Sequence, residues 1–98
     1  MTKSNLLLQA AELPTAWCSV IVGQAADANF KVLRMDDRAY PNETHDFDEA
    51  LLVLEGQMNL QVLDDIVAVK QGEVFIVPAG VPYAVAPGSY GTLVIIDR

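Results

Sequence analysis

The sequence predicts an all-β fold, a sandwich or a small barrel, and three observations lead to this expectation. Short runs rich in β-branched and aromatic residues recur along the chain, with turn residues between them. The one candidate helix, residues 6–13, is too short to be stable alone and is stopped by Pro14. The chain has 98 residues, which is enough for one domain, residues 1–98, and no more.

The expected strands follow one another from Trp17 to the end of the chain. The clearest lies at residues 57–63, where apolar and polar side chains alternate as in a strand with one buried face. Asp64-Asp65 is expected as the tight turn into the next strand. The expected strands cover residues 17–22, 30–35, 49–54, 57–63, 66–70, 73–77, 82–86 and 92–96.

Two of these strands are apolar on both faces, at residues 50–54 and 93–96. A strand in a single sheet with one solvated face should alternate, so both of these runs need cover on two sides. We expect the second cover to come from another copy of the chain, in a homodimer. The alternative is that residues 6–13 fold back over the sheet.

The charge of the chain indicates which partners it can have. The formal net charge is −7, and lysines and arginines are not clustered anywhere. A nucleic acid or an anionic membrane surface requires a basic surface, so neither is expected as a partner. No run approaches the roughly 18 apolar residues of a membrane span. The acidic composition fits a small or a cationic ligand and does not decide between them, and we expect a small-molecule ligand as the partner.

The cysteine content and the N-terminus indicate a cytoplasmic protein. Cys18 is the only cysteine, so an intrachain disulfide is excluded, and we expect it to be a small buried apolar residue. The apolar run near the start is ended too early by Gln9 and Glu12 to be a signal peptide.

The residues suited to chemistry gather between positions 43 and 49. Residues two apart on a strand face the same side, so Glu43, His45 and Glu49 share a face if the strand is regular. An imidazole with carboxylates suits a divalent metal such as Zn, Mn, Fe or Ni. The chain has one histidine, so any metal on these three residues would be held mostly by oxygen.

The spacing of this segment, and of a second one, resembles the two motifs of the cupin family. The first motif, Gly-x5-His-x-His-x(3,4)-Glu-x6-Gly, corresponds to residues 37–56, with Glu49-x6-Gly56 intact. The second, Gly-x5-Pro-x-Gly-x2-His-x3-Asn, corresponds to residues 72–87, with Gly72-x5-Pro78-x-Gly80 intact. The resemblance implies a cupin-type double-stranded β-helix, a small jelly-roll-like barrel that is often dimeric and carries its ligand site inside.

The ligand positions of the family are only half preserved. His45 and Glu49 match family ligands, whereas Glu43 and Tyr83 stand where the family has histidines. Both changes replace nitrogen by oxygen, so the resemblance implies a degenerate, oxygen-rich metal site. Two further motif positions differ, at Asp37 and Pro87.

Three interpretations of function remain open from the sequence, and the one ranked last is a purely structural subunit of a larger complex, which the doubly apolar strands permit. The first is a small-molecule-binding cupin of unassigned substrate, with a weakened metal site on His45, Glu49 and Glu43. If it is an enzyme, Glu49 or His45 would be the general base and Tyr83 a hydrogen-bond donor. The alternative is a metal-free binding or regulatory module, in which Glu49 bonds to Tyr83 or His45 and seals the pocket floor. Three apolar residues could line the pocket, although packing in the core is expected for each of them: Trp17, Met58 and Phe75.

Overall fold

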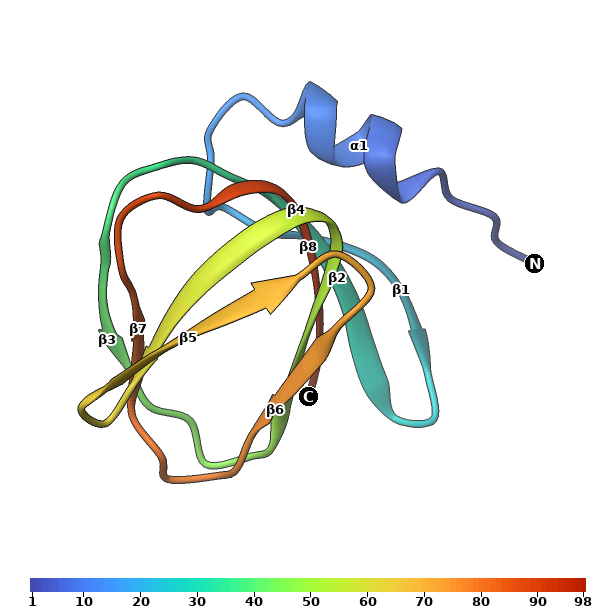
Figure 1. Ribbon diagram of the computed structural model, residues 1–98. Coiled ribbons are helices and arrows are strands. Elements are labelled where there is room, and N and C mark those ends of the chain that lie inside the picture. The colour runs from blue at the N-terminus through green and yellow to red at the C-terminus, as the bar shows by residue number, and fades with distance from the viewer.

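The computed structural model describes residues 1–98 and confirms the all-β prediction (Figure 1). One antiparallel sheet curls into a half-open barrel, and a single short helix lies outside it. The elements in chain order are α1 (Leu6–Glu12), β1 (Val20–Ala25), β2 (Ala28–Met35), β3 (Tyr40–Glu43), β4 (Glu49–Val62), β5 (Asp65–Lys70), β6 (Val74–Val77), β7 (Tyr83–Val85) and β8 (Tyr90–Asp97).

Strand β4 organises the sheet. The strand order is β1-β2-β8-β4-β7-β3, and β5 and β6 also pair with β4. The first half of β4 pairs with β6 and β8, and its second half pairs with β5 and β7. One long, bent strand therefore belongs to both sides of the barrel, and its first residues face the interior near β8.

β4 differs from the two strands predicted at residues 49–54 and 57–63. The chain does not turn at Gly56 but passes through a bulge, since the register with β8 shifts between Val53 and Glu55. Gly56 has φ +86° and pairs with Gly91. A Cβ atom at Gly56 would overlap the carbonyl oxygen of Tyr90, so this motif glycine allows two backbones to approach closely.

One strand begins earlier than predicted, and one turn lies away from its predicted place. The chain between β1 and β2 turns at Ala26-Asp27, and β2 begins at residue 28 instead of 30. The hairpin between β4 and β5 turns at Leu63-Asp64, one residue before the predicted Asp64-Asp65. Leu63 takes φ +56°, a conformation that its residue type does not signal.

The main core fills the inside of the barrel. Leu51, Met58 and Leu60 are at most 1% exposed, and burying each such side chain stabilises the fold by about 1.5–3 kcal/mol. The core cluster comprises Leu33, Met35, Leu51, Val53, Met58, Leu60, Val69, Val77, Tyr83, Val85 and Leu93. Because β2, β4, β7 and β8 all contribute, this packing fixes the strands that carry the site.

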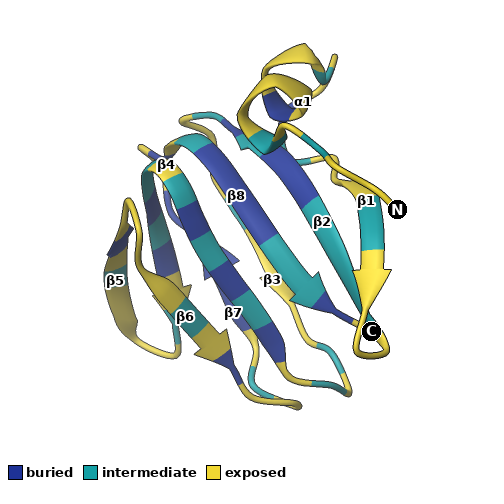
Figure 2. Cartoon of the chain, turned by 90° about the vertical axis from the view of Figure 1, so that its right-hand side faces the viewer, coloured by how far each residue is buried: buried dark blue, intermediate teal, exposed yellow.

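A second, smaller cluster covers part of the outer face of the sheet. Ala10 of α1 packs there with Val32 of β2 and Val94 of β8. Figure 2 shows α1 beside these two strands. The helix begins after Asn5, whose side chain accepts a hydrogen bond from the Leu8 N–H at 3.1 Å. The internal cover considered as the alternative is therefore found over β2 and β8.

The apolar outer face continues beyond the helix. Leu52 of β4 is only half-buried, and Val74 and Ile76 of β6 are 54% and 53% exposed. Figure 2 shows β6 uncovered at the side of the sheet away from α1. The homodimer that was expected to cover the apolar strands stays a prediction for this part of the face.

Cys18 is exposed, contrary to the prediction that it is buried. It follows Trp17, whose backbone N–H bonds to the Arg34 carbonyl at 2.8 Å and whose ring packs against the core. The indole takes the inward position in this segment, and the neighbouring thiol is left in solvent. The one helix of the structure falls short of the length and apolar character that a membrane-spanning helix needs.

Candidate functional site

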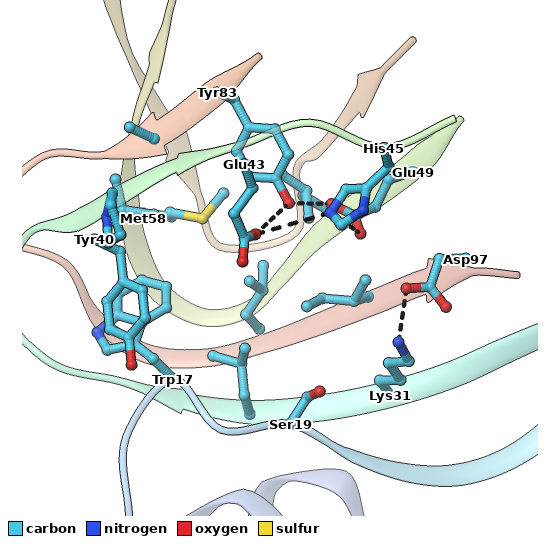
Figure 3. Close-up of a pocket in the computed structure, with 17 residues that line it drawn as sticks. Trp17, Ser19, Lys31, Tyr40, Glu43, His45, Glu49, Met58, Tyr83 and Asp97 are labelled. Carbon is cyan, nitrogen blue, oxygen red and sulfur yellow. Dashed lines mark hydrogen bonds and ion pairs between the residues drawn. The ribbon is translucent and has the colours of Figure 1, made fainter. Parts of the chain in front are cut away.

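A cavity of about 170 Å³ opens into the barrel, and every site residue expected from the sequence lines it (Figure 3). Its floor is formed by apolar side chains of the core, among them Leu33, Leu51 and Leu93. The charged and hydrogen-bonding side chains around it include Lys31, Glu43, His45, Glu49, Tyr83 and Asp97.

The four expected site residues come from three strands and a loop. Glu43 is the last residue of β3, Glu49 the first of β4 and Tyr83 the first of β7. His45 lies in the loop between β3 and β4, so the regular strand assumed for these residues is interrupted. They meet because β3 and β7 pair, with Glu43 opposite Tyr83.

The loop that carries His45 is held by the second motif. The N–H of Gly80 donates to the His45 carbonyl at 2.8 Å, and the N–H of Ala79 donates to the Asp48 carboxylate at 2.9 Å. The His45 ring also stacks on Phe47, with 5.0 Å between centroids. The turn after Pro78 thereby holds the imidazole at the pocket. The second motif thus supports the loop of the first motif that carries His45.

Tyr83 links the two glutamates. Its hydroxyl donates to Glu49 and also lies 3.2 Å from a carboxylate oxygen of Glu43. A phenol has one hydrogen to donate, and the shorter contact to Glu49 takes it. Tyr83 and Glu49 are 7% and 4% exposed, so this bond satisfies a carboxylate that would otherwise be buried without a partner.

The phenol remains protonated across the physiological range. Burial, then the hydrogen bond and the negative charge of Glu49, raise the pKa of Tyr83 well above its ordinary value of 10.0. Glu43 adds to the shift in the same direction. The Tyr83 hydroxyl is therefore a hydrogen-bond donor in this site and not a phenolate ligand.

His45 faces both carboxylates without bonding to either. Its Nε2 lies 3.8 Å from Glu49 Oε2 and 3.9 Å from Glu43 Oε2. These distances exceed a hydrogen bond, so each forms an ion pair only when the imidazole is protonated. The side chain is about one-third exposed, and its Nε2 can reach both the carboxylates and a molecule in the pocket.

The donors in their present arrangement do not fit a metal ion. The Tyr83 hydroxyl lies between the two carboxylates that would share the ion, and it donates its hydrogen to Glu49. No three histidine, cysteine or acidic side chains are grouped as metal ligands. A metal on His45, Glu49 and Glu43 stays a prediction that requires Tyr83 to move aside.

The pocket also contains a second polar pair, which the sequence did not predict. Lys31 Nζ bonds Asp97 Oδ2 at 2.8 Å, and their side chains are 24% and 4% exposed. The strand pattern offered one signal, since Lys31 is a charged residue with the inward parity of Leu33 and Met35. Nothing in the sequence around Asp97, which lies 66 residues away, indicated that it is the partner of Lys31.

Aromatic side chains form another wall of the pocket. The rings of Trp17 and Tyr40 lie 5.3 Å apart and are tilted by 43°. The Trp17 Nε1–H donates to Asp36 at 2.8 Å, which orients the indole. Of the three apolar residues weighed from the sequence, Trp17 and Met58 line the pocket, whereas Phe75 packs against the core outside it.

Comparison with known proteins identifies the family. The family model described as "Cupin domain" matches residues 34–97, and the chain belongs to the cupin family. The match spans both motif segments, residues 37–56 and 72–87, and it agrees with the fold and with the resemblance drawn from the motifs. No curated protein sequence matches the chain at a significant level.

Solved structures share the fold over nearly the whole chain. A cupin-2 domain protein of Shewanella frigidimarina is 22% identical with a TM-score of 0.86, covering 97% of this chain and 94% of that one. A protein of Neisseria meningitidis is 24% identical with a TM-score of 0.82, covering 97% of each chain. A hydroquinone 1,2-dioxygenase of a Sphingomonas species, with 4-hydroxybenzoate bound, is 15% identical with a TM-score of 0.82, covering 96% and 72%.

Proposed function

We propose that this cupin binds a small organic molecule in the pocket between β2, β4, β7 and β8. The observation that carries the proposal is the convergence of Glu43, His45, Glu49 and Tyr83 on one cavity with an apolar floor. Pockets of this composition, mostly apolar with a few polar groups at one place, are typical of ligand sites. Glu49 is 4% exposed, and a buried carboxylate at the end of an apolar pocket is typical of a ligand site.

The polar end of the pocket would orient the ligand. Glu43 is exposed and accepts hydrogen bonds, and His45 can accept or donate one through Nε2. If the ligand is a substrate, His45 is the residue best placed to exchange a proton with it, because Glu49 already accepts the Tyr83 hydrogen.

A divalent ion is the second candidate ligand of this end of the pocket. The observation in its favour is that Nε2 of His45 lies within 4 Å of both Glu43 and Glu49. An ion of the Zn, Mn, Fe or Ni type would have to displace the Tyr83 hydroxyl from the two carboxylates. We therefore rank metal-free binding first and metal binding second.

The experiment that tests binding is a ligand-observed NMR screen of neutral and charged aromatic fragments close to benzene in size. Ser19 lines the pocket and is exposed, so Ser19→Phe would fill the opening without disturbing the core. Cys18→Phe places the same side chain one residue earlier, outside the pocket, and serves as the control. We expect fragment binding to be lost in Ser19→Phe and kept in Cys18→Phe.

Two outcomes would count against the proposal. Either no fragment binds the wild-type protein, or binding is the same in Ser19→Phe, Cys18→Phe and the wild type. The second outcome would mean that the fragments bind outside the pocket.

We further propose that the protein is a homodimer that buries the outer face of β4 and β6. Support comes from the exposed Val74 and Ile76, which extend the apolar surface of Leu52 across the sheet. The helix α1 packs on the same outer face over β2 and β8, and it leaves the part of the face formed by β6 uncovered (Figure 2). Neither nucleic acid nor membrane is proposed as a partner, in keeping with the net charge of −7.

A further inference from the structure

The pocket holds a band of polar side chains that crosses three neighbouring strands. Lys31 of β2 bonds to Asp97 of β8, as Figure 3 shows. The register that pairs Ala50 with Ile96 makes Glu49 and Asp97 the next positions along β4 and β8. Two buried carboxylates thus stand on adjacent strands, both facing the same cavity.

Asp97 is incompletely satisfied. Its Oδ2 accepts from Lys31, but its Oδ1 is buried without any hydrogen-bond partner, and the residue is 5% exposed. A buried acceptor left unpaired destabilises a fold by about 1–3 kcal/mol, and more when it is charged. Glu49 on the next strand cannot help, because two ionised carboxylates repel each other and neither has a hydrogen to donate.

Negative charge exceeds positive charge around the cavity. Three carboxylates line it, those of Glu43, Glu49 and Asp97, against one lysine and one histidine. The excess is negative whether or not His45 carries a proton. Lys31 is already paired with Asp97, so its charge is largely compensated before any ligand arrives.

From this geometry we propose that the ligand is a small protonated amine whose N–H group donates to Asp97 Oδ1, beside Glu49. The inference rests on the proposed binding function and specifies its ligand class. A cation between the two carboxylates would relieve their repulsion and give the unpaired oxygen its missing donor. Hydrogen bonds between an ammonium and a carboxylate are among the stronger ones in proteins.

The rest of the cavity sets the size and character of the ligand body. A volume of about 170 Å³ compares with the ~150 Å³ of apolar cavities that hold one benzene molecule. The wall formed by Trp17 and Tyr40 presents aromatic surface, which attracts both apolar rings and cations. An amine on one flat or branched apolar group of about six carbons matches this space.

Isothermal titration calorimetry with three probes of one shape tests the inference. Benzylamine is the cation, benzyl alcohol the neutral counterpart and benzoate the anion. We expect benzylamine to bind at least about tenfold more tightly than benzyl alcohol, and benzoate to bind most weakly. This ranking is obtained with the wild-type protein and does not depend on any variant folding.

A charge-matched pair of variants then assigns the effect to Asp97. Asp97→Asn keeps the shape and removes the charge, and we expect it to weaken benzylamine about tenfold while leaving benzyl alcohol unchanged. Asp64→Asn removes the same charge on the exposed turn between β4 and β5, outside the pocket, and should bind all three probes as the wild type does. If Asp97→Asn binds benzyl alcohol as tightly as the wild type does, its weaker binding of benzylamine reflects a lost contact and not a damaged fold.

Other results would overturn the inference in distinguishable ways. Tightest binding of benzoate would mean that Lys31 selects anions, and equal binding of all three probes would mean that charge does not select the ligand. In both cases the proposed binding function would stand. Failure of every probe to bind would overturn the inference together with the proposed function.

Discussion

Tyr83 donates its only hydroxyl hydrogen to Glu49 and so joins the first residue of β7 to the first residue of β4 across the pocket. In the family motifs these two positions belong to metal ligands, a histidine and a glutamate. Here a phenol replaces the histidine and donates a hydrogen bond to the glutamate.

Tyr83→Phe tests the contribution of this bond to stability. The variant leaves a buried carboxylate without its donor, and we expect it to lower the free energy of unfolding by about 1.5–3 kcal/mol at neutral pH. Tyr40→Phe is the matched control, because Tyr40 lines the same pocket and is only half-buried. Chemical denaturation measures both, and equal losses in the two variants would contradict the assigned role.

The Tyr83→Phe variant also tests how the stability of the protein depends on pH in the alkaline range. The pKa of Tyr83 is raised in the folded protein, so the unfolded chain loses the phenol proton first as the pH rises. The stability from this group is therefore complete below about pH 10 and declines above it. We expect the difference between wild type and Tyr83→Phe to shrink from pH 9 to pH 11, approximately in line with unfolded tyrosine titration. A constant difference over that range would argue against a buried, bonded phenol.

The metal site of the family should be recoverable. The double variant Glu43→His with Tyr83→His restores both motif histidines beside His45 and Glu49. We expect it to retain close to one equivalent of Zn, Mn, Fe or Ni after desalting, and the wild type to retain clearly less. Elemental analysis measures the content, and the triple variant with Glu49→Ala is the control. Stoichiometric metal in the wild type would favour the second candidate function.

The sequence predicted the acidic end of the pocket well, because motif spacing alone placed Glu43, His45, Glu49 and Tyr83 together. It could not predict the partner of Lys31, since that pairing depends on the register between β2 and β8. In this register Lys31 lies opposite Ile95 and Asn29 opposite Asp97, which makes the ion pair diagonal. Short-range patterns carry no information on which distant strands become neighbours.

The error at Gly56 has a different cause. A glycine after apolar residues signals both a turn and a close approach of two backbones, and the local sequence does not separate them. The deciding residue is Gly91, 35 positions later, which faces Gly56 across β4 and β8. The same limit explains the shifted turn at Leu63, whose left-handed backbone is imposed by the pairing of Val62 with Asp65.

Gly56→Ala tests the close approach at the bulge. Alanine there would overlap the Tyr90 carbonyl and would also have to adopt φ +86°. The backbone conformation alone costs about 1–2 kcal/mol, and we expect a total loss of more than about 2 kcal/mol. Gly72→Ala measures the cost of the backbone conformation alone, because Gly72 has φ +83° but a Cβ atom added there would meet open space. Thermal unfolding should rank Gly56→Ala clearly below Gly72→Ala, and the reverse order would show that crowding is unimportant.

Ile76→Lys tests the proposed dimer through the uncovered part of the sheet. Ile76 is 53% exposed on β6 and lies beside Ala50 of β4, so a lysine there costs little in the monomer. At the centre of an apolar interface the same charge would lose its water, and we expect it to convert a dimer to monomers. Sedimentation velocity measures this directly. Ile66→Lys makes the same change on β5, where Ile66 is 64% exposed and pairs with the other half of β4 from β6, and should leave the dimer intact. A wild-type protein that is monomeric throughout the micromolar range would mean that β6 is simply an exposed edge.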